Sequence, residues 1–363
     1  MKVTVAMDSF KGSLTSLEAG NAVKNGILEV CPDAEVTVIP LADGGEGTID
    51  ALAPYIHGIS KTIMVRGPLG NAVEADYVFE PVEKCAYIEM AKASGLTLVK
   101  PDERDPYRAS TYGTGELIKD AILCGAQKLV ICIGGSATND GGAGMLQALG
   151  ARLTDSNGDE IMPGAIGLKD LVSADLTDLM GRALDITVAC DVTNPLCGPD
   201  GASYVYGPQK GATNEQAANM DSWLNHYAQV LGSDPYEEGT GAAGGMSFAL
   251  KNVLSAKIRP GADIVTGITG AEDLIRNSDL VITGEGRMDS QTVSGKAPYR
   301  ILMLGTKYGK PVYGITGILG EGFEACLKAG FARILPLANP TMVTSEAIKS
   351  VSETVGMLIR EIR

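Results

Sequence analysis

The chain has 363 residues, with 30 Lys or Arg and 44 Asp or Glu, which gives a formal net charge of −14 and a pI near 4.7. This acidity argues against nucleic acid and anionic membranes as partners, because both attract basic surfaces. No apolar run approaches the roughly 18 residues that span a bilayer. Seven cysteines without C-x-x-C or metal-ligand spacing favour free thiols in the cytoplasm. The length favours two domains.

The first two predicted strands both lead into polar loops rich in glycine. A strand over residues 2–7 precedes Asp8-Ser-Phe-Lys-Gly-Ser13, and a strand over residues 35–40 precedes Ala42-Asp-Gly-Gly-Glu-Gly-Thr48. Open parallel sheets bind ligands at the carboxyl ends of their strands. Capping of the following helices is the structural alternative for both loops. The candidates for contact with a metal, a substrate hydroxyl or a phosphate are Asp8, Ser9, Lys11 and Asp43.

The pattern changes near residue 60. Rapid alternation and short turns over residues 61–89 predict antiparallel strands there. Arg66, just before Gly67-Pro68, is a candidate clamp for a carboxylate, and a solvated Arg at a strand end is the alternative. Further on, Gly113-Thr-Gly115 opens a predicted helix and is a candidate anion site.

The run from Leu129 to Met145 is the most informative stretch of the sequence. It joins a β-branched strand, residues 129–133, to a helix that starts near Ala143. Glycines between them can aim backbone N–H groups at an anion, and a helix N-terminus adds a favourable dipole. The stretch predicts a site for phosphate and a divalent cation; the alternative is a tightly packed turn. Its candidate residues are Gly134, Gly135, Ser136, Thr138, Asn139, Asp140, Gly141 and Gly142.

A predicted strand over residues 186–190 is followed by two further polar candidates, Asp191 and Asn194. A carboxylate at the end of a buried strand is well placed to act as a base or a metal ligand, and an Asx turn is the alternative. Lys210, within Gly207-Pro-Gln-Lys-Gly211, adds a candidate cation.

The alternation of strands and helices returns in the last third of the chain, with predicted strands over residues 279–283, 311–316 and 333–337. We therefore predict an α/β fold: a Rossmann-like doubly wound sheet interrupted by a large inserted α/β domain. The sheet domain comprises residues 1–60 plus 262–363, and the insert residues 61–261. Candidate ligands after the first of these strands are Gly284, Glu285, Gly286, Arg287, Asp289 and Lys296.

Familiar nucleotide signatures do not occur in these loops. Gly113-Thr-Gly115 and Gly284-Glu-Gly286 lack the third glycine of G-x-G-x-x-G, and no Walker A motif is found. With only His57 and His226, a Ser-His-Asp hydrolase is disfavoured. Phosphoryl transfer requires glycine loops, carboxylates and isolated cations. The residues alone therefore predict a phosphate-handling α/β enzyme.

Several long motifs together resemble the bacterial glycerate kinases of the type I family, over nearly the whole chain. The resemblance implies ATP-dependent, Mg²⁺-assisted phosphorylation of D-glycerate, mostly to 2-phosphoglycerate, in a two-domain α/β protein with its site in the interdomain cleft. It leaves open which hydroxyl reacts and whether the protein is a homo-oligomer. The motifs are Asp8–Leu14, Ala42–Thr48, Gly67–Gly70, Gly113–Leu117, Ile133–Gly144, Ala189–Leu196, Gly207–Gly211 and Ile282–Ser290.

Under this hypothesis each candidate has a role. Asp191 accepts the hydroxyl proton, with Asp8 as the alternative base and Lys11 as a catalytic cation. Glycerate is bound by Ser9, Arg66, Asn194, Lys210 and Arg287. The ATP phosphates lie on the loops Gly134–Gly142 and Gly284–Gly286, near Lys296. Mg²⁺ is held by some of Asp43, Asp140 and Asp289.

Two other classes of protein stay open from the residues. One is an NAD-dependent hydroxy-acid dehydrogenase, which would need no ATP. The other is a non-catalytic protein that binds small acids and never consumes ATP. An assay for ADP formation from ATP and glycerate separates the three.

Overall fold

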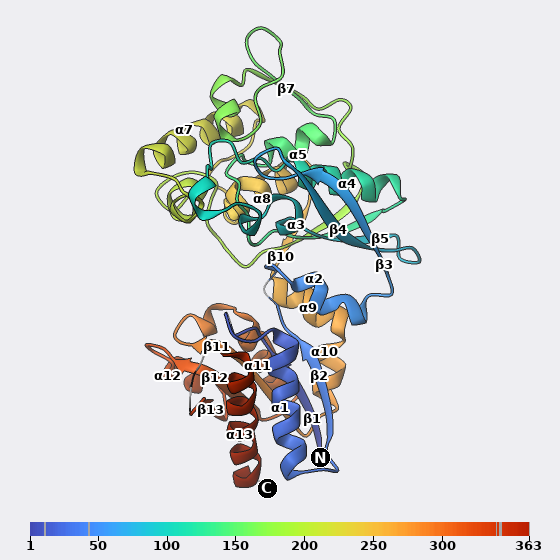
Figure 1. The fold of residues 1–363 in the computed structure, drawn as a ribbon, viewed down its shortest axis with the longest axis vertical. Helices are drawn as coiled ribbons and strands as arrows, with labels where there is room; N and C mark the ends of the chain where they lie inside the picture. The colour runs from blue at the N-terminus through green and yellow to red at the C-terminus, as the bar shows by residue number, and fades with distance from the viewer. Residues whose placement is uncertain (11, 43, 339, 341–342, 363) are drawn as a thin grey trace. The chain divides into compact units, whose positions relative to one another are not determined.

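The computed structural model describes residues 1–10, 12–42, 44–338, 340 and 343–362 (Figure 1). The chain forms two compact units. Unit 1 comprises Met1–Asp43, Asp50–Tyr55 and Gly261–Arg363, and unit 2 comprises Gly44–Ile49 and Ile56–Pro260. Our predicted boundaries put Gly44–Ile49 in the first domain, whereas this segment packs with unit 2.

Unit 1 is built on a five-stranded parallel sheet with the strand order β13-β12-β11-β1-β2. Its strands are β1 (Lys2–Met7), β2 (Glu35–Pro40), β11 (Leu280–Met288), β12 (Val312–Leu319) and β13 (Arg333–Pro336). The central strands β1 and β11 are buried along most of their length, which explains their apolar sequences. The helices of the unit are α1 (Ser16–Val30), α9 (Gly261–Thr269), α10 (Ala271–Arg276), α11 (Ala297–Lys307), α12 (Glu324–Ala329) and α13 (Thr344–Ile362).

Helices cover both faces of this sheet. On one face α1 and α13 run side by side (Figure 1), and Gly26 permits their contact, because a Cβ there would lie 2.3 Å from the carbonyl oxygen of Ser352. A capping box formed by Thr15 and Glu18 starts α1 soon after β1. The opposite face packs against α9, α10 and α11. The polar loops at the carboxyl ends of the strands thus share one edge of the sheet.

Unit 2 contains a six-stranded mixed sheet with the order β10-β9-β6-β5-β4-β3. Its strands are β3 (Ile59–Arg66), β4 (Ala72–Glu80), β5 (Cys85–Glu89), β6 (Lys128–Cys132), β9 (Asp185–Ala189) and β10 (Lys257–Arg259). The antiparallel pairing predicted for residues 61–89 is confirmed for β3, β4 and β5. The strands β5, β6, β9 and β10 are parallel. A separate antiparallel pair is formed by β7 (Arg152–Thr154) and β8 (Ser173–Asp175).

The helices of unit 2 enclose one large apolar core. They are α3 (Ala91–Ser94), α4 (Tyr112–Leu123), α5 (Ala143–Ala148), α6 (Ala202–Tyr206), α7 (Asn214–Val230) and α8 (Ala242–Asn252), while α2 (Thr48–Leu52) spans the boundary between the units. Gly113 and Gly115 are buried inside α4, where Cβ atoms would lie 1.9 Å from the Arg66 carbonyl oxygen and 2.6 Å from that of Met145. These glycines serve close packing, so the structure does not support an anion site there.

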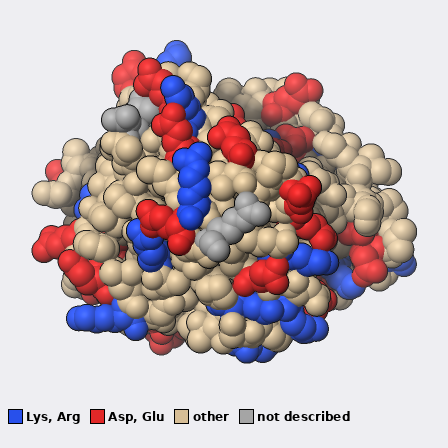
Figure 2. Space-filling model, turned by 90° about the horizontal axis from the view of Figure 1, so that it is seen from below, with Lys and Arg blue, Asp and Glu red and all other residues tan. Residues whose placement is uncertain are grey.

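The surface carries charges of both signs. On the face shown in Figure 2, Lys and Arg are interspersed with Asp and Glu. The seven cysteines are free thiols. Within the described part of the chain, none of the helices combines the length and the apolar character needed to cross a membrane.

Candidate functional site

The segment Gly44–Ile49 is anchored to unit 2 by a buried carboxylate. Glu89, the last residue of β5, is 2% exposed. Its Oε2 accepts the N–H of Gly47 at 3.1 Å, and its Oε1 accepts the N–H of Ile49 at 2.6 Å. A buried carboxylate is costly unless it accepts hydrogen bonds of this kind. Glu89 therefore holds the second predicted glycine motif at the carboxyl end of β5.

The same segment contacts the ends of the next two strands. The N–H of Gly134, after β6, donates to the carbonyl oxygen of Gly44 at 3.2 Å. A Cβ on Gly44 would lie 2.8 Å from the Cβ of Ala189, the last residue of β9. Gly44 also has a φ of +84°, which favours glycine. The glycine motifs around residues 44 and 134 thus meet at one edge of the unit 2 sheet.

The rest of the loop Gly134–Gly142 is folded inward. The N–H of Gly141 donates to the carbonyl oxygen of Gly244 at 2.9 Å, and the N–H of Gly142 donates to Asp140 Oδ1 at 3.1 Å. Residues 136–142 are buried, whereas Gly134 is half-buried and Gly135 exposed. An anion site needs N–H groups that are open to the ligand. Gly134 and Gly135 are the more accessible glycines of this loop, and the phosphate site stays a prediction.

Three polar side chains of this loop are buried as well. Asn139 Nδ2 donates to Ser203 Oγ at 2.8 Å, whereas Asn139 Oδ1 and Thr138 Oγ1 are buried and have no hydrogen-bond partner among the described residues. Ser136 Oγ accepts a hydrogen bond from Lys210. Ser136, Thr138 and Asn139 are buried in unit 2, and their contact with nucleotide stays a prediction.

Asp140 is a fully buried acceptor for backbone and hydroxyl donors. Its Oδ2 accepts the N–H and the hydroxyl of Thr111 at 2.8 and 2.9 Å, and the N–H of Gly144 at 3.3 Å. Burial raises its carboxyl pKa, and these hydrogen bonds oppose that rise. A metal ligand needs oxygens open to the ion. These hydrogen bonds join the starts of α4 and α5 through Asp140, and Mg²⁺ binding by Asp140 stays a prediction.

Lys210 is buried behind the same loop. It closes the 3-10 turn η5 (Pro208–Lys210) and is 2% exposed. Its Nζ donates to Ser136 Oγ at 2.8 Å and to the Thr138 carbonyl oxygen at 2.6 Å. Burial lowers the pKa of the Lys210 ammonium to about 7, with a smaller opposing effect from Asp140. Lys210 supports the loop from inside, and its contact with substrate stays a prediction.

Asp191 lies just beyond the end of β9 and is exposed. Asn194 is tied into the following loop, because its Nδ2 donates to the Asp200 carbonyl oxygen at 2.8 Å and its Oδ1 accepts the Tyr206 hydroxyl at 2.7 Å. The role of Asp191 as a proton acceptor stays a prediction. Asn194 shapes the loop, so its expected contact with substrate is not supported.

Arg66 ends β3 at the same edge of the sheet, since β3 runs in the direction of β5. Its guanidinium lies 4.0 Å from the ring centroid of Tyr112, and its Nε is 3.8 Å from Glu116 Oε1. The side chain is 56% exposed. Stacking on Tyr112 restrains the guanidinium while it stays accessible to a carboxylate.

In unit 1, Asp8 directly follows β1. Its N–H donates to the carbonyl oxygen of Gly284 at 2.8 Å, and one of its carboxylate oxygens accepts the N–H of Ser9 at 2.7 Å. Both Asp8 and Ser9 are half-buried. Lys11 and Asp43, two further candidates, lie outside the described residues.

The predicted loop at Gly284 is part of a strand. Gly284, Glu285 and Gly286 belong to β11, which extends to Met288 and pairs with β12. A Cβ on Gly284 would lie 1.8 Å from the Ile315 carbonyl oxygen. The glycine permits close strand packing, and phosphate binding by this stretch stays a prediction. Because β1 pairs with β11 only as far as Gly284, the strand projects beyond its neighbour.

The projecting part of β11 carries a compact charge cluster. Lys296 Nζ lies 3.4 Å from Glu285 Oε2 and 3.8 Å from Asp289 Oδ1, and Arg287 Nε lies 3.3 Å from Asp289 Oδ2. Thr292 donates its hydroxyl to Glu285 Oε1 at 2.6 Å. Burial raises the pKa of the Glu285 carboxyl, against the opposing effects of Thr292 and Lys296. The structure thus brings four predicted candidates together.

The described carboxylates do not form a Mg²⁺ cage. No group of three or more His, Cys, Asp or Glu side chains suited to a metal occurs among them. Asp140 has its oxygens occupied by protein donors, and Asp289 is paired with two cations. These residues therefore do not fit a resident Mg²⁺ ion. Mg²⁺ bound to phosphates commonly takes only one or two protein carboxylates.

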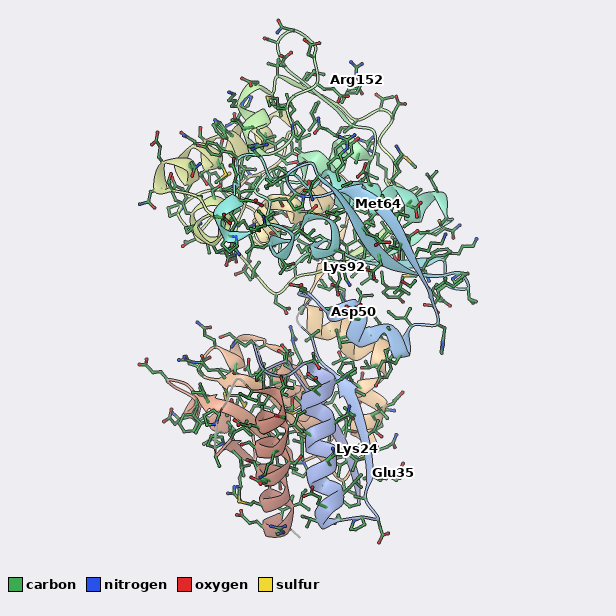
Figure 3. The ribbon with its side chains drawn as sticks, viewed as in Figure 1. Lys24, Glu35, Asp50, Met64, Lys92 and Arg152 are labelled. Carbon is green, nitrogen blue, oxygen red and sulfur yellow. The ribbon has the colours of Figure 1, made fainter. Side chains whose placement is uncertain are left out.

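Two residues of the unit 2 edge were missed by the sequence reasoning. Glu89 ends a buried strand without a glycine motif beside it. Lys92, labelled in Figure 3 on α3, lies 3.3 Å from Asp76. A charged residue at the end of an apolar strand is the signal that would have found Glu89.

The fold and these loops are typical of α/β enzymes that act on small molecules. Such enzymes carry charged groups at the carboxyl ends of parallel strands, as both units of this protein do. Comparison with known proteins then identifies the family. The model of the glycerate kinase family matches residues 3–363, and the chain belongs to this family.

Similar proteins cover the chain from end to end. A glycerate kinase of Halalkalibacterium halodurans is 43% identical over 99% of this chain and 97% of its own length. The glycerate 2-kinase of Escherichia coli K12 is 43% identical over 100% of this chain and 97% of its own length. A crystal structure assigned to glycerate kinase 2 of Salmonella typhimurium LT2 is 45% identical, with a TM-score of 0.87, over 100% of this chain and 97% of that one.

Proposed function

We propose that this protein is a glycerate kinase that transfers the γ-phosphoryl group of ATP to the 2-hydroxyl of D-glycerate, giving ADP and 2-phosphoglycerate. The observation that carries the proposal is the match along the whole chain to proteins named glycerate kinase, one of them a glycerate 2-kinase. Phosphoryl transfer depends on positioning and on charge stabilisation. Each unit by itself carries charged groups at the carboxyl ends of its strands, which supports the proposal.

Asp191 is our candidate proton acceptor. Its carboxylate takes the proton from the glycerate hydroxyl as the hydroxyl oxygen bonds to the γ-phosphorus and the bond to the ADP oxygen breaks. Its exposure at the end of β9 supports this role. Asp8, at the end of β1, is the alternative base.

Cations at the strand ends fit the anionic groups of the two substrates. Lys296 and Arg287 offset negative charge on the phosphates, and their present partners, Glu285 and Asp289, orient them. Arg66 clamps the glycerate carboxylate, for which its exposed and stacked guanidinium is suited. In this proposal Mg²⁺ enters together with ATP as the substrate Mg·ATP. The free cysteines support a cytoplasmic location.

A coupled assay tests the reaction. Mg·ATP and D-glycerate should give ADP together with a product whose phosphorus NMR signal couples to the proton on C2. Reduction or oxidation of a nicotinamide without ATP consumption would point to the dehydrogenase alternative. Binding of glycerate without ADP release would point to a non-catalytic protein.

The role of Asp191 has its own test. Asp191→Asn should lower kcat about 100-fold or more, the scale of a general base. Asp200→Asn, an exposed carboxylate in the same loop, is the matched control and should keep its activity. An Asp191→Asn enzyme with near-normal kcat would remove Asp191 from this role.

A further inference from the structure

The Gly44–Ile49 segment links three neighbouring strand ends of unit 2. It is bound to Glu89 after β5, it accepts the Gly134 N–H after β6, and Gly44 lies against Ala189 at the end of β9. These strands are adjacent in the sheet. A displacement of the segment at one strand end is therefore transmitted to the other two.

The contact with β9 connects the segment to the proposed proton acceptor. A Cβ on Gly44 would lie 3.0 Å from the Ala189 carbonyl oxygen, so the backbones are in direct contact. Asp191 is the second residue after Ala189 and is exposed. The backbone that aims Asp191 is thus restrained from one side by the Gly44–Ile49 segment.

Glu89 is the side chain that binds the C-terminal half of this segment, at Gly47 and Ile49. It is 2% exposed, and its two oxygens each accept one backbone N–H, from Gly47 and Ile49. Loss of one oxygen leaves one of these N–H groups without its acceptor and weakens the attachment of the segment. The segment would then shift or open locally.

We propose that Glu89 is a positioning residue for the kinase reaction, acting through the Gly44–Ile49 segment on the backbone that carries Asp191. The inference rests on the proposed function. Glu89 touches no substrate in this scheme. Because small misplacements of reacting groups lower kcat steeply while ground-state binding is retained, its effect falls on kcat.

Glu89→Gln is the principal variant. The glutamine is isosteric and can accept one of the two N–H groups, but its amide NH₂ meets the other donor. We expect kcat to fall about tenfold or more, with the KM values for D-glycerate and Mg·ATP changed less than about threefold. Amide exchange of a peptide covering residues 44–49 should accelerate, while exchange in α7 stays unchanged.

Asp155→Asn is the matched control. Asp155 Oδ1 also accepts two backbone N–H groups, from Asn157 at 2.8 Å and Asp159 at 3.1 Å. It follows β7, whose Arg152 lies at the opposite end of unit 2 from Lys92 in Figure 3. The control should keep kcat and the exchange rate of residues 44–49.

The measurements separate the possible outcomes. Wild-type kcat in Glu89→Gln, or a reduced kcat with residues 44–49 still protected, would overturn the proposal. If Glu89→Gln does not fold, Glu89→Asp retains the charge but shortens the reach, and the same two readouts apply. If the wild-type enzyme does not phosphorylate glycerate, the proposed function fails, and the exchange result still reports whether Glu89 holds the segment.

Discussion

Replacing Lys210 by methionine should remove a pH-dependent penalty from the stability of unit 2. Burial lowers the pKa of Lys210 from 10.5 to about 7. Each pH unit of such a difference is worth about 1.4 kcal/mol. The buried ammonium therefore costs about 5 kcal/mol well below pH 7, and the cost vanishes above the pKa of the unfolded chain.

The sign follows from proton binding. Between pH 7 and 10.5 the unfolded chain holds a proton on Lys210 that the folded chain has lost, so stability rises with pH. Methionine fills a similar volume but carries no charge. It also leaves Ser136 Oγ and the Thr138 carbonyl oxygen without their donor, an offset that does not depend on pH.

The difference in unfolding free energy between Lys210→Met and the wild type isolates the contribution of Lys210, because the other titrating groups are common to both proteins. The stability of Lys210→Met minus that of the wild type should fall by about 2–3 kcal/mol from about pH 6 to about pH 9. Urea unfolding followed by the fluorescence of Trp223 measures it, since the single tryptophan lies in α7 of unit 2. Parallel stability curves for the two proteins would refute a lowered pKa at Lys210.

Two further substitutions, one of them with a control, test packing and burial. Gly284→Ala places a Cβ 1.8 Å from the Ile315 carbonyl oxygen and should lower the melting temperature of unit 1 in calorimetry. The control is Gly267→Ala, where a Cβ meets nothing within 4 Å. It should be neutral or stabilising by up to about 1 kcal/mol. Asp140→Asn sets an amide NH₂ against the donors of Thr111 and Gly144 and should cost about 3 kcal/mol in urea unfolding. An Asp140→Asn protein as stable as the wild type would contradict the structural role of this carboxylate.

The general layout of the protein could be predicted because its signals are local. Apolar runs indicated the buried strands β1 and β11, and rapid turns indicated the antiparallel strands of residues 61–89. The motifs also pointed to the glycerate kinase family, to which the chain belongs. The strand-end position of Asp191 followed from the end of a short strand.

Whether the glycines bind phosphate or permit close packing could not be predicted from the sequence. A backbone that cradles a phosphate and a backbone that packs against another both need the absence of Cβ. At Gly141, Gly142 and Gly284 the neighbours prove to be protein atoms. Sequence spacing contains nothing that separates the two cases.

The partners of the buried charges depend on residues far apart in the chain. Glu89 binds Gly47 and Ile49 across 42 and 40 positions, and Lys210 binds Ser136 across 74. Whether a carboxylate is a free ligand, as expected of Asp140, or a saturated hydrogen-bond acceptor depends on how much water packing removes and which donors it brings near. The exclusion of water and the nearby donors are properties of the folded chain, and the local sequence pattern does not determine them.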